Sequence, residues 1–386
     1  MNLEFTEEQL AVRQMAKDFA EKKVAPLAAE LDRDSRYPNE LVEEMAGLSF
    51  MGMCVPEAYG GAGMDMLSYV LALEEISTAC ASTGVIMSVN NSLACEPIHR
   101  WGTEDQKKKY LTPLAKGEML GCYALTEPNA GTDAANQQTK AEKKSGVYVL
   151  NGTKQFITNG NEADLAIVYA LTDPAKGKKG ISAFIVETKS KGFKVSKKEK
   201  KLGIRGSSCV QLTLENLEVP AENLLHQEND GYKVALSTLE VGRIGIAAQA
   251  LGIGAASLAS ALRYSKEREQ FGESIASFQA IQFMLADMAT RLEASRWLTY
   301  KAASLKDAGE RTPLESSQAK LYSSEMCMYN SWAAVQIHGG YGYIEDYVPE
   351  RLFRDAKICE IYEGTSEVQR LLIARSIMQE TFLENL

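Results

Sequence analysis

Near its C-terminal end the chain reads Ile361-Tyr362-Glu363-Gly364-Thr365-Ser366-Glu367-Val368-Gln369-Arg370. The hydroxyl residues Thr365 and Ser366, followed by Glu367, are typical of a helix start, and the apolar residues after them predict the buried face of that helix. A glutamate held on the preceding turn and partly stripped of water would have its pKa raised towards neutrality, so Glu363 could act as a base. The simpler alternative is a capping box, with Thr365 or Ser366 as N-cap and Glu363 exposed. The rest of the chain decides between the two.

The composition is that of a globular protein with free thiols. With 386 residues, of which 45% are hydrophobic, the chain can form a core in two or three domains. A net charge of -9 argues against nucleic acid as the main partner. The 7 cysteines are scattered and odd in number, which favours free thiols in a reducing compartment over a disulfide framework. The 3 histidines lie far apart, so we expect no metal site.

No segment is predicted to enter a membrane. The N-terminus carries acidic residues early and lacks the basic-then-apolar order of a signal peptide; instead it predicts a helix that starts after Thr6. Two uncharged stretches are long enough to raise the question of a membrane span: 76–95 and 244–262. Both are rich in small and polar residues, so they predict buried helices instead. We therefore expect a protein of the bacterial cytoplasm, or of the mitochondrial matrix after processing.

Helical and strand-like patterns divide the chain into three parts. Helical spacing dominates the first 120 residues and returns after Pro220, in long segments near 232–264, 275–308 and 313–338. Between them lie short β-branched or aromatic runs at 147–150, 165–171, 181–186 and 210–214, several bounded by turn residues. The pattern predicts an α+β fold: an N-terminal α-helical domain (1–120), a small middle antiparallel β domain (121–228) and a C-terminal four-helix-bundle domain (229–386).

Two conspicuous features are interpreted as structural. The segment Gly252-Ile253-Gly254 looks like a dinucleotide fingerprint, but it lacks the third glycine, follows no strand and lies inside a helical pattern. Its small residues favour tight helix packing instead. The lysine-rich run 194–201 predicts a solvated edge or loop.

Several other segments combine groups that suit a planar or phosphorylated ligand. The segment 123–133 joins hydroxyls, a glycine and a proline-fixed turn, and Phe156 and Thr158 lie two apart on a predicted strand, hence on one face. The glycine pair after His338 would let backbone N–H groups approach a phosphate or ring. Taken singly, these are also an ordinary loop, a strand end and a helix end.

Together these segments resemble the acyl-CoA dehydrogenase family, most closely its short-chain (butyryl-CoA) branch. The resemblance covers essentially the whole chain and rests on five ordered motifs: 123–133, 156–159, Arg268 with Gln279, 336–340, and Arg354-Asp355-Ala356 followed by 361–369. It implies a noncovalently bound FAD and an oxidoreductase that acts on a CH–CH bond. Their joint appearance favours Glu363 as a base over the exposed alternative.

The resemblance also implies roles for single residues. The flavin ring would be held by Tyr123, Leu125, Thr126, Gly131, Thr132, Phe156, Ile157 and Thr158, with Thr365 and Glu367 contacting the cofactor in the same subunit. The FAD of a neighbouring subunit would be reached by Arg268, Gln279, Gln336, Ile337, Gly339 and Gly340, which implies a homotetramer built as a dimer of dimers. The substrate would be contacted by Thr132, Glu240, Arg243 and Gly364.

The implied reaction is α,β-dehydrogenation of a short-chain acyl-CoA to the trans-2-enoyl-CoA. Glu363 would remove the α-proton while hydride passes from Cβ to flavin N5. The thioester carbonyl must be polarised, because an unassisted α-proton is too weakly acidic for a carboxylate. In the family the backbone N–H of the base and a ribityl hydroxyl of FAD donate those hydrogen bonds. The electrons would pass to an electron-transferring flavoprotein.

Sequence differences between the branches of this family narrow the choice of branch. Isovaleryl and long-chain members carry the base on a helix, at the position of Gly242 here, and glycine cannot serve, so Glu363 is the only candidate. The arginine that glutaryl-CoA members carry near 84–86 is missing, while 85–93 resembles the short-chain branch, and its helix would help to floor the acyl cavity. Three alternatives stay open: a dehydrogenase of branched or alicyclic acyl-CoA, an acyl-CoA oxidase, and a noncatalytic flavin subunit of an electron-transfer complex.

Overall fold

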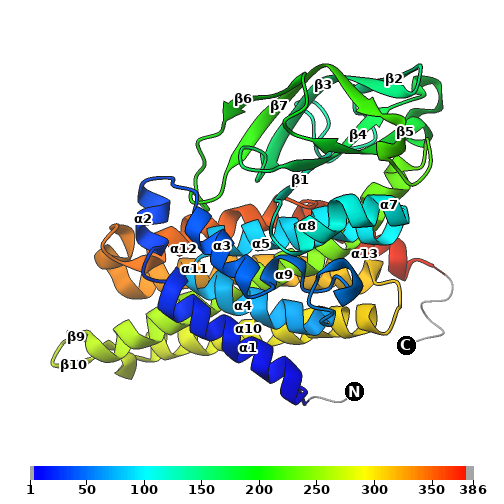
Figure 1. Ribbon diagram of the computed structural model, residues 1–386. Coiled ribbons are helices and arrows are strands. Elements are labelled where there is room, and N and C mark those ends of the chain that lie inside the picture. Colours follow the sequence, from blue (N-terminus) through cyan, green and yellow to red (C-terminus); the bar gives the residue numbers. More distant parts are fainter. Residues whose placement is uncertain (1–3, 380–386) are drawn as a thin grey trace.

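The computed structural model describes residues 4–379 and places a β-sheet unit at one end of two sets of helices (Figure 1). Helices come first along the chain, then strands, then helices again, which confirms the predicted α+β architecture. Residues 1–3 and 380–386, which the predicted first and third domains include, lie outside the described part of the chain.

The first helical part begins at a side-chain cap that the sequence predicts. The Thr6 hydroxyl accepts a hydrogen bond from the backbone N–H of Gln9, and the Gln9 side-chain oxygen accepts one from the backbone N–H of Thr6. This capping box fixes the start of α1. The elements that follow are α1 (Glu7–Phe19), η1 (Ala20–Val24), α2 (Ala28–Arg33), α3 (Asn39–Gly47), η2 (Phe50–Gly52), η3 (Glu57–Tyr59), α4 (Met66–Ala79), α5 (Ala81–Ser88), η4 (Val89–Cys95), α6 (Glu96–Trp101), α7 (Glu104–Gln106), η5 (Lys107–Leu111) and α8 (Thr112–Ala115).

The segment α5–η4 forms the inner wall of this helical part. Every residue from 81 to 95 is buried, although the segment contains asparagines and serines. The amide of Asn90 donates to the carbonyls of Met51 and Leu114, and its oxygen accepts the N–H of Gly121 at the start of the sheet. The polar groups of Asn90 are thus satisfied inside the protein, and the segment is a core element, as predicted.

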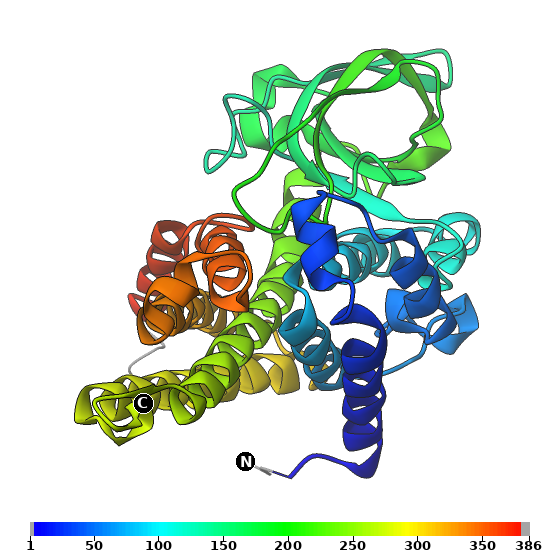
Figure 2. The same ribbon diagram turned by 90° about the vertical axis from the view of Figure 1, so that its left-hand side faces the viewer.

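The middle of the chain forms one sheet of 8 strands, with the order β6-β7-β3-β2-β4-β5-β8 and β1 paired to β4. Its pairs are mostly antiparallel, as predicted, while β1–β4 and the short β2–β4 contact are parallel. Figure 2 shows this sheet strongly curved above the helices. The elements are β1 (Gly121–Ala124), β2 (Lys140–Lys144), β3 (Val147–Thr158), β4 (Leu165–Leu171), η6 (Pro174–Gly180), β5 (Ile181–Glu187), β6 (Phe193–Lys198), β7 (Cys209–Pro220), η7 (Ala221–Asn223) and β8 (Leu224–Leu225).

The lysine-rich run lies at the sheet edge. Strand β6 is the end strand of the sheet order, and residues 194–198 on it are exposed. Charged side chains on an edge strand oppose pairing with another chain. This placement agrees with the predicted solvated edge.

The last part of the chain is a bundle of long helices around α9. This helix has 37 residues and packs against α4, α10 and α11. The elements are α9 (Gly231–Glu267), β9 (Glu269–Gln270), β10 (Glu273–Ser274), η8 (Ile275–Ser277), α10 (Gln279–Asp307), α11 (Pro313–His338), η9 (Gly339–Tyr343), α12 (Val348–Ala356), η10 (Lys357–Glu360) and α13 (Ser366–Ile377).

Helix α9 is apolar because it crosses the protein core. By length and composition alone it could span a membrane, but 72% of its most apolar window is buried inside the protein. A Cβ atom at Gly252 would lie 2.6 Å from the carbonyl oxygen of Glu74 on α4. The glycines of the false fingerprint therefore permit close helix contact, as the sequence predicts.

Candidate active site

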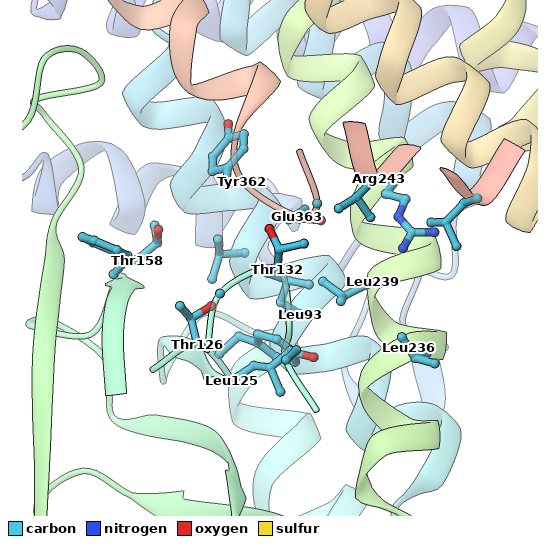
Figure 3. Close-up of a pocket in the computed structure, with 18 of the residues that line it drawn as sticks. Leu93, Leu125, Thr126, Thr132, Thr158, Leu236, Leu239, Arg243, Tyr362 and Glu363 are labelled. Atoms are coloured by element: carbon cyan, nitrogen blue, oxygen red, sulfur yellow. The ribbon is translucent and has the colours of Figure 1, made fainter. Parts of the chain in front are cut away.

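A cavity of about 430 Å³ opens between the sheet, the inner wall α5–η4 and the helices α9 and α13. In Figure 3, Leu236, Leu239 and Arg243 lie along α9 on one side, and Thr158 lies at the end of β3 on the other. The volume and the mainly apolar lining are typical of a site for a small organic molecule. The lining residues are Val89, Leu93, Tyr123, Leu125, Thr126, Gly131, Thr132, Ala134, Phe156, Ile157, Thr158, Tyr232, Leu236, Leu239, Arg243, Tyr362, Glu363, Gly364, Val368, Leu371, Leu372 and Arg375.

Glu363 reaches this cavity from a strained turn between η10 and α13. Both it and the next residue have left-handed backbones, with φ of 52° for Glu363 and 97° for Gly364. Thr365 caps α13 by accepting the N–H of Val368 at 3.4 Å. The expected helix cap is therefore present, yet the Glu363 side chain turns inward. Strain of this kind at a non-glycine residue is typical of functional sites.

The Glu363 carboxylate is buried without a hydrogen bond to one of its oxygens. Its Oε2 atom has no partner among residues 4–379. Burial raises the pKa of Glu363 to about 7, and the positive charges of Lys320 and Arg243 limit the rise. A carboxylate with a pKa near neutrality and a free oxygen is suited to take a proton from a bound molecule.

Arg243 supplies the positive charge that lines the same cavity. Its Nε atom is also buried and has no partner within the described residues. Burial lowers the pKa of Arg243, and the nearby carboxylates of Glu363 and Glu240 oppose this change. An unpaired buried donor costs free energy, so the arginine is prepared for a polar ligand.

Gly242 leaves the space that the Glu363 carboxylate occupies. A Cβ atom at this position would lie 2.0 Å from Glu363 Oε2 and 3.0 Å from the Leu93 side chain. No real contact is that short, so any side chain here would displace the carboxylate. Position 242 is therefore closed to a side chain as long as the Glu363 carboxylate keeps this place.

We expect Gly242→Ala to lower kcat by about a hundredfold, because a displacement of about 1 Å at a catalytic group has that cost. The measurement is steady-state turnover of an acyl-CoA by the FAD-loaded variant. The matched control is Gly47→Ala at the end of α3, where an added Cβ meets nothing within 4 Å. Equal loss in both variants, or none in Gly242→Ala, would contradict the steric argument.

A buried ion pair holds the loop that forms one wall of the cavity. The Lys154 ammonium donates to Glu127 Oε1 at 2.8 Å, to the Leu125 carbonyl at 3.1 Å and to Gln137 Oε1 at 3.1 Å. The Glu127 carboxylate in turn accepts the N–H of Gln138 at 2.6 Å and that of Thr139 at 3.0 Å. All three lysine donors are thus used to close the segment 125–139 onto β3.

The Phe156 segment differs from a regular strand. The register of β3 against β7 shifts between Lys154 and Ile157, and Phe156 has φ of 58°. Phe156 and Thr158 both line the cavity, but the bulge breaks the simple alternation that the sequence pattern assumes. Phe156 is 63% exposed, so its ring faces open space rather than the core.

The predicted site residues fall into two groups, of which the first surrounds this cavity. It contains Tyr123, Leu125, Thr126, Gly131, Thr132, Phe156, Ile157, Thr158, Arg243, Glu363 and Gly364. The second surrounds a more open hollow, also about 430 Å³, at the other end of α9, and contains Arg268, Ile337, Gly339 and Gly340. The predicted contacts Gln279, Gln336 and Glu367 are exposed and Thr365 is half-buried; none of the four lines either space.

Glu240 has a different environment from the one expected. Its carboxylate accepts the N–H of Thr312 at 2.6 Å, at the start of α11, and lies 3.8 Å from the Arg311 guanidinium. It does not line the cavity. The geometry gives Glu240 a role in joining α9 to α11, and its substrate contact stays a prediction.

Several cavity residues were not singled out from the sequence. On α9, Tyr232, Leu236 and Leu239 share one face with Arg243, at the spacing of an α-helix. Four residues of α13 repeat at the same spacing, whereas Val89 and Leu93 belong to the segment 85–93 that was expected to help floor the acyl cavity. The helical spacing of the apolar residues is visible in each segment. An apolar helix face, however, can line a cavity or pack in the protein core, and the sequence alone does not distinguish the two.

Three family models match the chain in order. Residues 6–118 match the acyl-CoA dehydrogenase N-terminal domain, 122–217 the middle domain and 229–378 the C-terminal domain. The fold and the three matched domains define an oxidoreductase of the acyl-CoA dehydrogenase class. The chain belongs to the acyl-CoA dehydrogenase family.

Named relatives cover nearly the whole chain. It is 52% identical to an acyl-CoA dehydrogenase, short-chain specific, of Clostridium acetobutylicum, over 98% of this chain and 100% of the relative. The solved butyryl-CoA dehydrogenase of Megasphaera elsdenii is 47% identical, with a TM-score of 0.97 over 98% of this chain and 100% of that one. A chain from a structure of the electron transferring flavoprotein of Acidaminococcus fermentans is 50% identical, with a TM-score of 0.98 over 98% and 100%.

The family's cofactor is FAD, and the residues around the cavity fit it. An exposed aromatic ring, the threonines at positions 126, 132 and 158, and a free backbone surface at Gly131 face one space, which suits a planar ring with polar edges. Within residues 4–379 no group of three or more His, Cys, Asp or Glu side chains is arranged to hold a metal ion.

Proposed function

We propose that this enzyme converts a short-chain acyl-CoA to its trans-2-enoyl-CoA and passes the electrons to an electron-transferring flavoprotein. The observation that carries the proposal is the buried, unpartnered Oε2 atom of Glu363, which lines a cavity of about 430 Å³ together with apolar and hydroxyl side chains. The short-chain names of the relatives from Clostridium and Megasphaera, each about half identical to this chain, support the substrate class.

Glu363 acts as the base of the reaction. It takes the α-proton of the thioester, so that the Cα–H bond breaks and its electron pair enters the new Cα–Cβ double bond. Bound FAD supplies the acceptor for the hydride from Cβ. Desolvation by the substrate strengthens the carboxylate as a base, because burial in a drier site favours its protonated form.

The other cavity residues bind and orient. The segments 123–132 and 156–158 would hold the flavin ring, and Gly364 and Thr132 would contact the thioester end of the substrate. Leu93, Leu239 and Val89 provide apolar surface for a short acyl chain. The backbone N–H of Glu363 would donate to the thioester oxygen, and this polarisation would make the α-proton more acidic.

Anaerobic addition of butyryl-CoA to the yellow holoenzyme tests the function directly. We expect loss of the oxidised flavin absorbance within seconds, and crotonyl-CoA as the product. Absence of bleaching would leave a noncatalytic flavin subunit as the function, and rapid turnover in air with peroxide release would identify an oxidase. A panel with hexanoyl-, isobutyryl- and cyclohexanecarboxyl-CoA ranks the acyl groups.

The rate should depend on the ionisation of Glu363. Since burial raises its pKa to about 7, we expect kcat/KM for butyryl-CoA to fall as pH drops below that value. The base must be deprotonated in the free enzyme, so the loss approaches about tenfold per pH unit. A plot of log kcat/KM from pH 5 to 9 measures it; a flat profile down to pH 5 would mean an ordinary carboxylate or another base.

We also propose a homotetramer, a dimer of dimers, in which the second hollow receives part of a neighbouring subunit's FAD. The support is the group of Arg268, Ile337, Gly339 and Gly340 around one open space, with the Arg268 guanidinium 5.7 Å from the centre of the Tyr341 ring. The domain limits 1–120, 121–228 and 229–386 and a location in the bacterial cytoplasm, or the mitochondrial matrix, belong to the same proposal.

Arg268→Ala should weaken FAD retention about tenfold and shift the assembly towards dimers, because the variant loses a charged contact at a subunit boundary. Flavin-to-protein absorbance after gel filtration, with light scattering for mass, measures both. The control is Arg263→Ala, an exposed arginine on the same helix that lines neither space. Unchanged flavin content and mass would remove the intersubunit role.

A further inference from the structure

Lys320 on α11 is a fully buried lysine that the reaction described above does not use. Its relative exposure is 0%, and it does not line the cavity. Among residues 4–379 no carboxylate lies within ion-pair distance of its ammonium, which donates instead to the carbonyl oxygen of Gly364 at 2.7 Å. A buried ammonium is costly to retain, so its position calls for an explanation.

The contact falls on the strained turn that carries the base. Glu363 and Gly364 are two consecutive left-handed residues, and each has its carbonyl oxygen fixed by a buried side chain. The amide of Gln369, on α13, donates to the Glu363 oxygen at 3.3 Å and to the Gly364 oxygen at 2.9 Å. The Gly364 oxygen thus accepts from both Lys320 and Gln369, one from each flanking helix.

The charges around the base give Lys320 a second effect. The titratable groups near Lys320 are Cys359 on η10, Glu363, Arg243 on α9 and Cys327 on its own helix. Those near Glu363 are Lys320 and Arg243, together with the hydroxyls of Tyr69, Tyr123 and Tyr362. Burial raises the pKa of each of these tyrosines and of Cys327, which keeps them neutral. Among the described residues, Lys320 and Arg243 are therefore the two cations that act on the base, and of these two only Arg243 lines the cavity.

We infer that Lys320 is a positioning residue for the dehydrogenation: its ammonium fixes the Glu363–Gly364 turn through the Gly364 carbonyl and places a positive charge near the base. The inference rests on the proposed function, since it concerns the base of that reaction. Hydrogen bonding holds the turn against its strain, and the charge favours the ionised carboxylate. Burial lowers the pKa of Lys320 itself to about 8, so it remains mostly charged at neutral pH.

The chain offers a matched set of variants that separates charge from hydrogen bonding. Lys320→Gln removes the charge and keeps a donor for the Gly364 oxygen. Gln369→Met removes a donor to the same oxygen and leaves the charge in place. Lys320→Arg keeps the charge and a donor. Each FAD-loaded variant is measured for kcat and KM with butyryl-CoA from pH 5 to 9.

For Lys320→Gln we expect the midpoint of the acidic limb of kcat/KM to move up by about one pH unit, because an opposing charge has been lost. Lys320→Arg should keep the wild-type midpoint. Gln369→Met should lower kcat several-fold and leave the midpoint in place. A folded, FAD-loaded Lys320→Gln with the wild-type midpoint would overturn the inference.

Two further measurements cover the other outcomes. If Lys320→Gln does not fold, Lys320→Met serves as the second neutral variant. If neither neutral variant folds, the test rests on Lys320→Arg. A shift of about one pH unit in the midpoint of its acidic limb would then overturn the inference. Wild-type enzyme that fails to oxidise any acyl-CoA of the panel refutes the proposed function. Active wild type with unmoved variants refutes only the role of Lys320.

Discussion

Glu363→Gln is expected to lower turnover of butyryl-CoA by about 10⁴-fold while FAD remains bound, the upper end of the range for loss of a general base. Glutamine has nearly the same shape, so the carboxamide occupies the space above Gly242 without a new clash. It cannot accept a proton at neutral pH. Within residues 4–379, no other Asp or Glu side chain lines the cavity, so none is at hand to replace Glu363 as the base.

Stopped-flow reduction of the flavin under anaerobic conditions measures this loss at the chemical step. Glu363→Asp, which retracts the carboxylate by one methylene, should retain more of the rate than glutamine. The matched control is Glu360→Gln on η10, where the carboxylate pairs with Lys357 at 2.6 Å and does not line the cavity. More than a tenth of the wild-type rate in Glu363→Gln would remove Glu363 from the role of base.

The same variant should be more stable than wild type above neutral pH. The folded-state pKa of Glu363 is raised to about 7, so the folded protein holds this proton more tightly than the unfolded chain does. Its contribution to stability is present at low pH and is lost as pH rises through that value. Glutamine does not titrate in this range, so the variant avoids this loss of stability. A higher stability of the variant would show that wild type keeps an ionisable base in this place at the expense of stability.

The sequence predicts local features of this fold well because neighbouring residues determine them. The capping box at Thr6, the cap at Thr365 and the glycines of α9 are each decided within one or two turns of chain. The order of helices and strands follows from the same short-range periods. The resemblance of several such segments to one family, taken together, then predicts Glu363 as the base, and this assignment stays a prediction.

What the sequence does not reveal depends on contacts between distant segments. Lys320 meets Gly364 across 44 positions, and Lys154 meets Leu125 across 29. A lysine in a helix or strand is ordinarily solvated, so no local pattern predicts that these two are buried. The bulge at Phe156 and the parallel pairing of β1 with β4 likewise arise from packing of whole elements.

Lys154→Met is the second change with a large expected effect: about 3 kcal/mol of stability should be lost, since Glu127 would remain buried without its counter-ion. In wild type, burial alone would raise the pKa of Glu127, but Lys154 and the N–H donors of the loop hold it below its usual value. Burial lowers the pKa of Lys154 to about 8. The pair thus stays ionised at neutral pH inside the protein.

The loss should appear first in FAD binding. Lys154 precedes the cavity residues Phe156, Ile157 and Thr158 on β3, and its donors hold the loop that supplies Thr126 and Thr132. If the whole loss of stability falls on the cavity wall, so that binding FAD must first order this wall, the Kd for FAD rises about a hundredfold. Flavin fluorescence during titration of the apoprotein, and urea unfolding of the holoenzyme, measure the two quantities. Lys143→Met on β2, where an exposed lysine pairs with Glu228, is the control.

A double variant distinguishes the charge from the scaffold. Glu127→Gln combined with Lys154→Met leaves no unpaired charge, so stability should recover in part, as replaced buried ion pairs generally do. FAD affinity should recover less, because the Leu125 carbonyl and Gln137 still lack the donors that close the loop. Full recovery of both would mean that the pair is needed only for charge balance. Recovery of stability alone would show that the Lys154 ammonium is needed to hold the two segments proposed to bind the flavin, 125–139 and 156–158, in place.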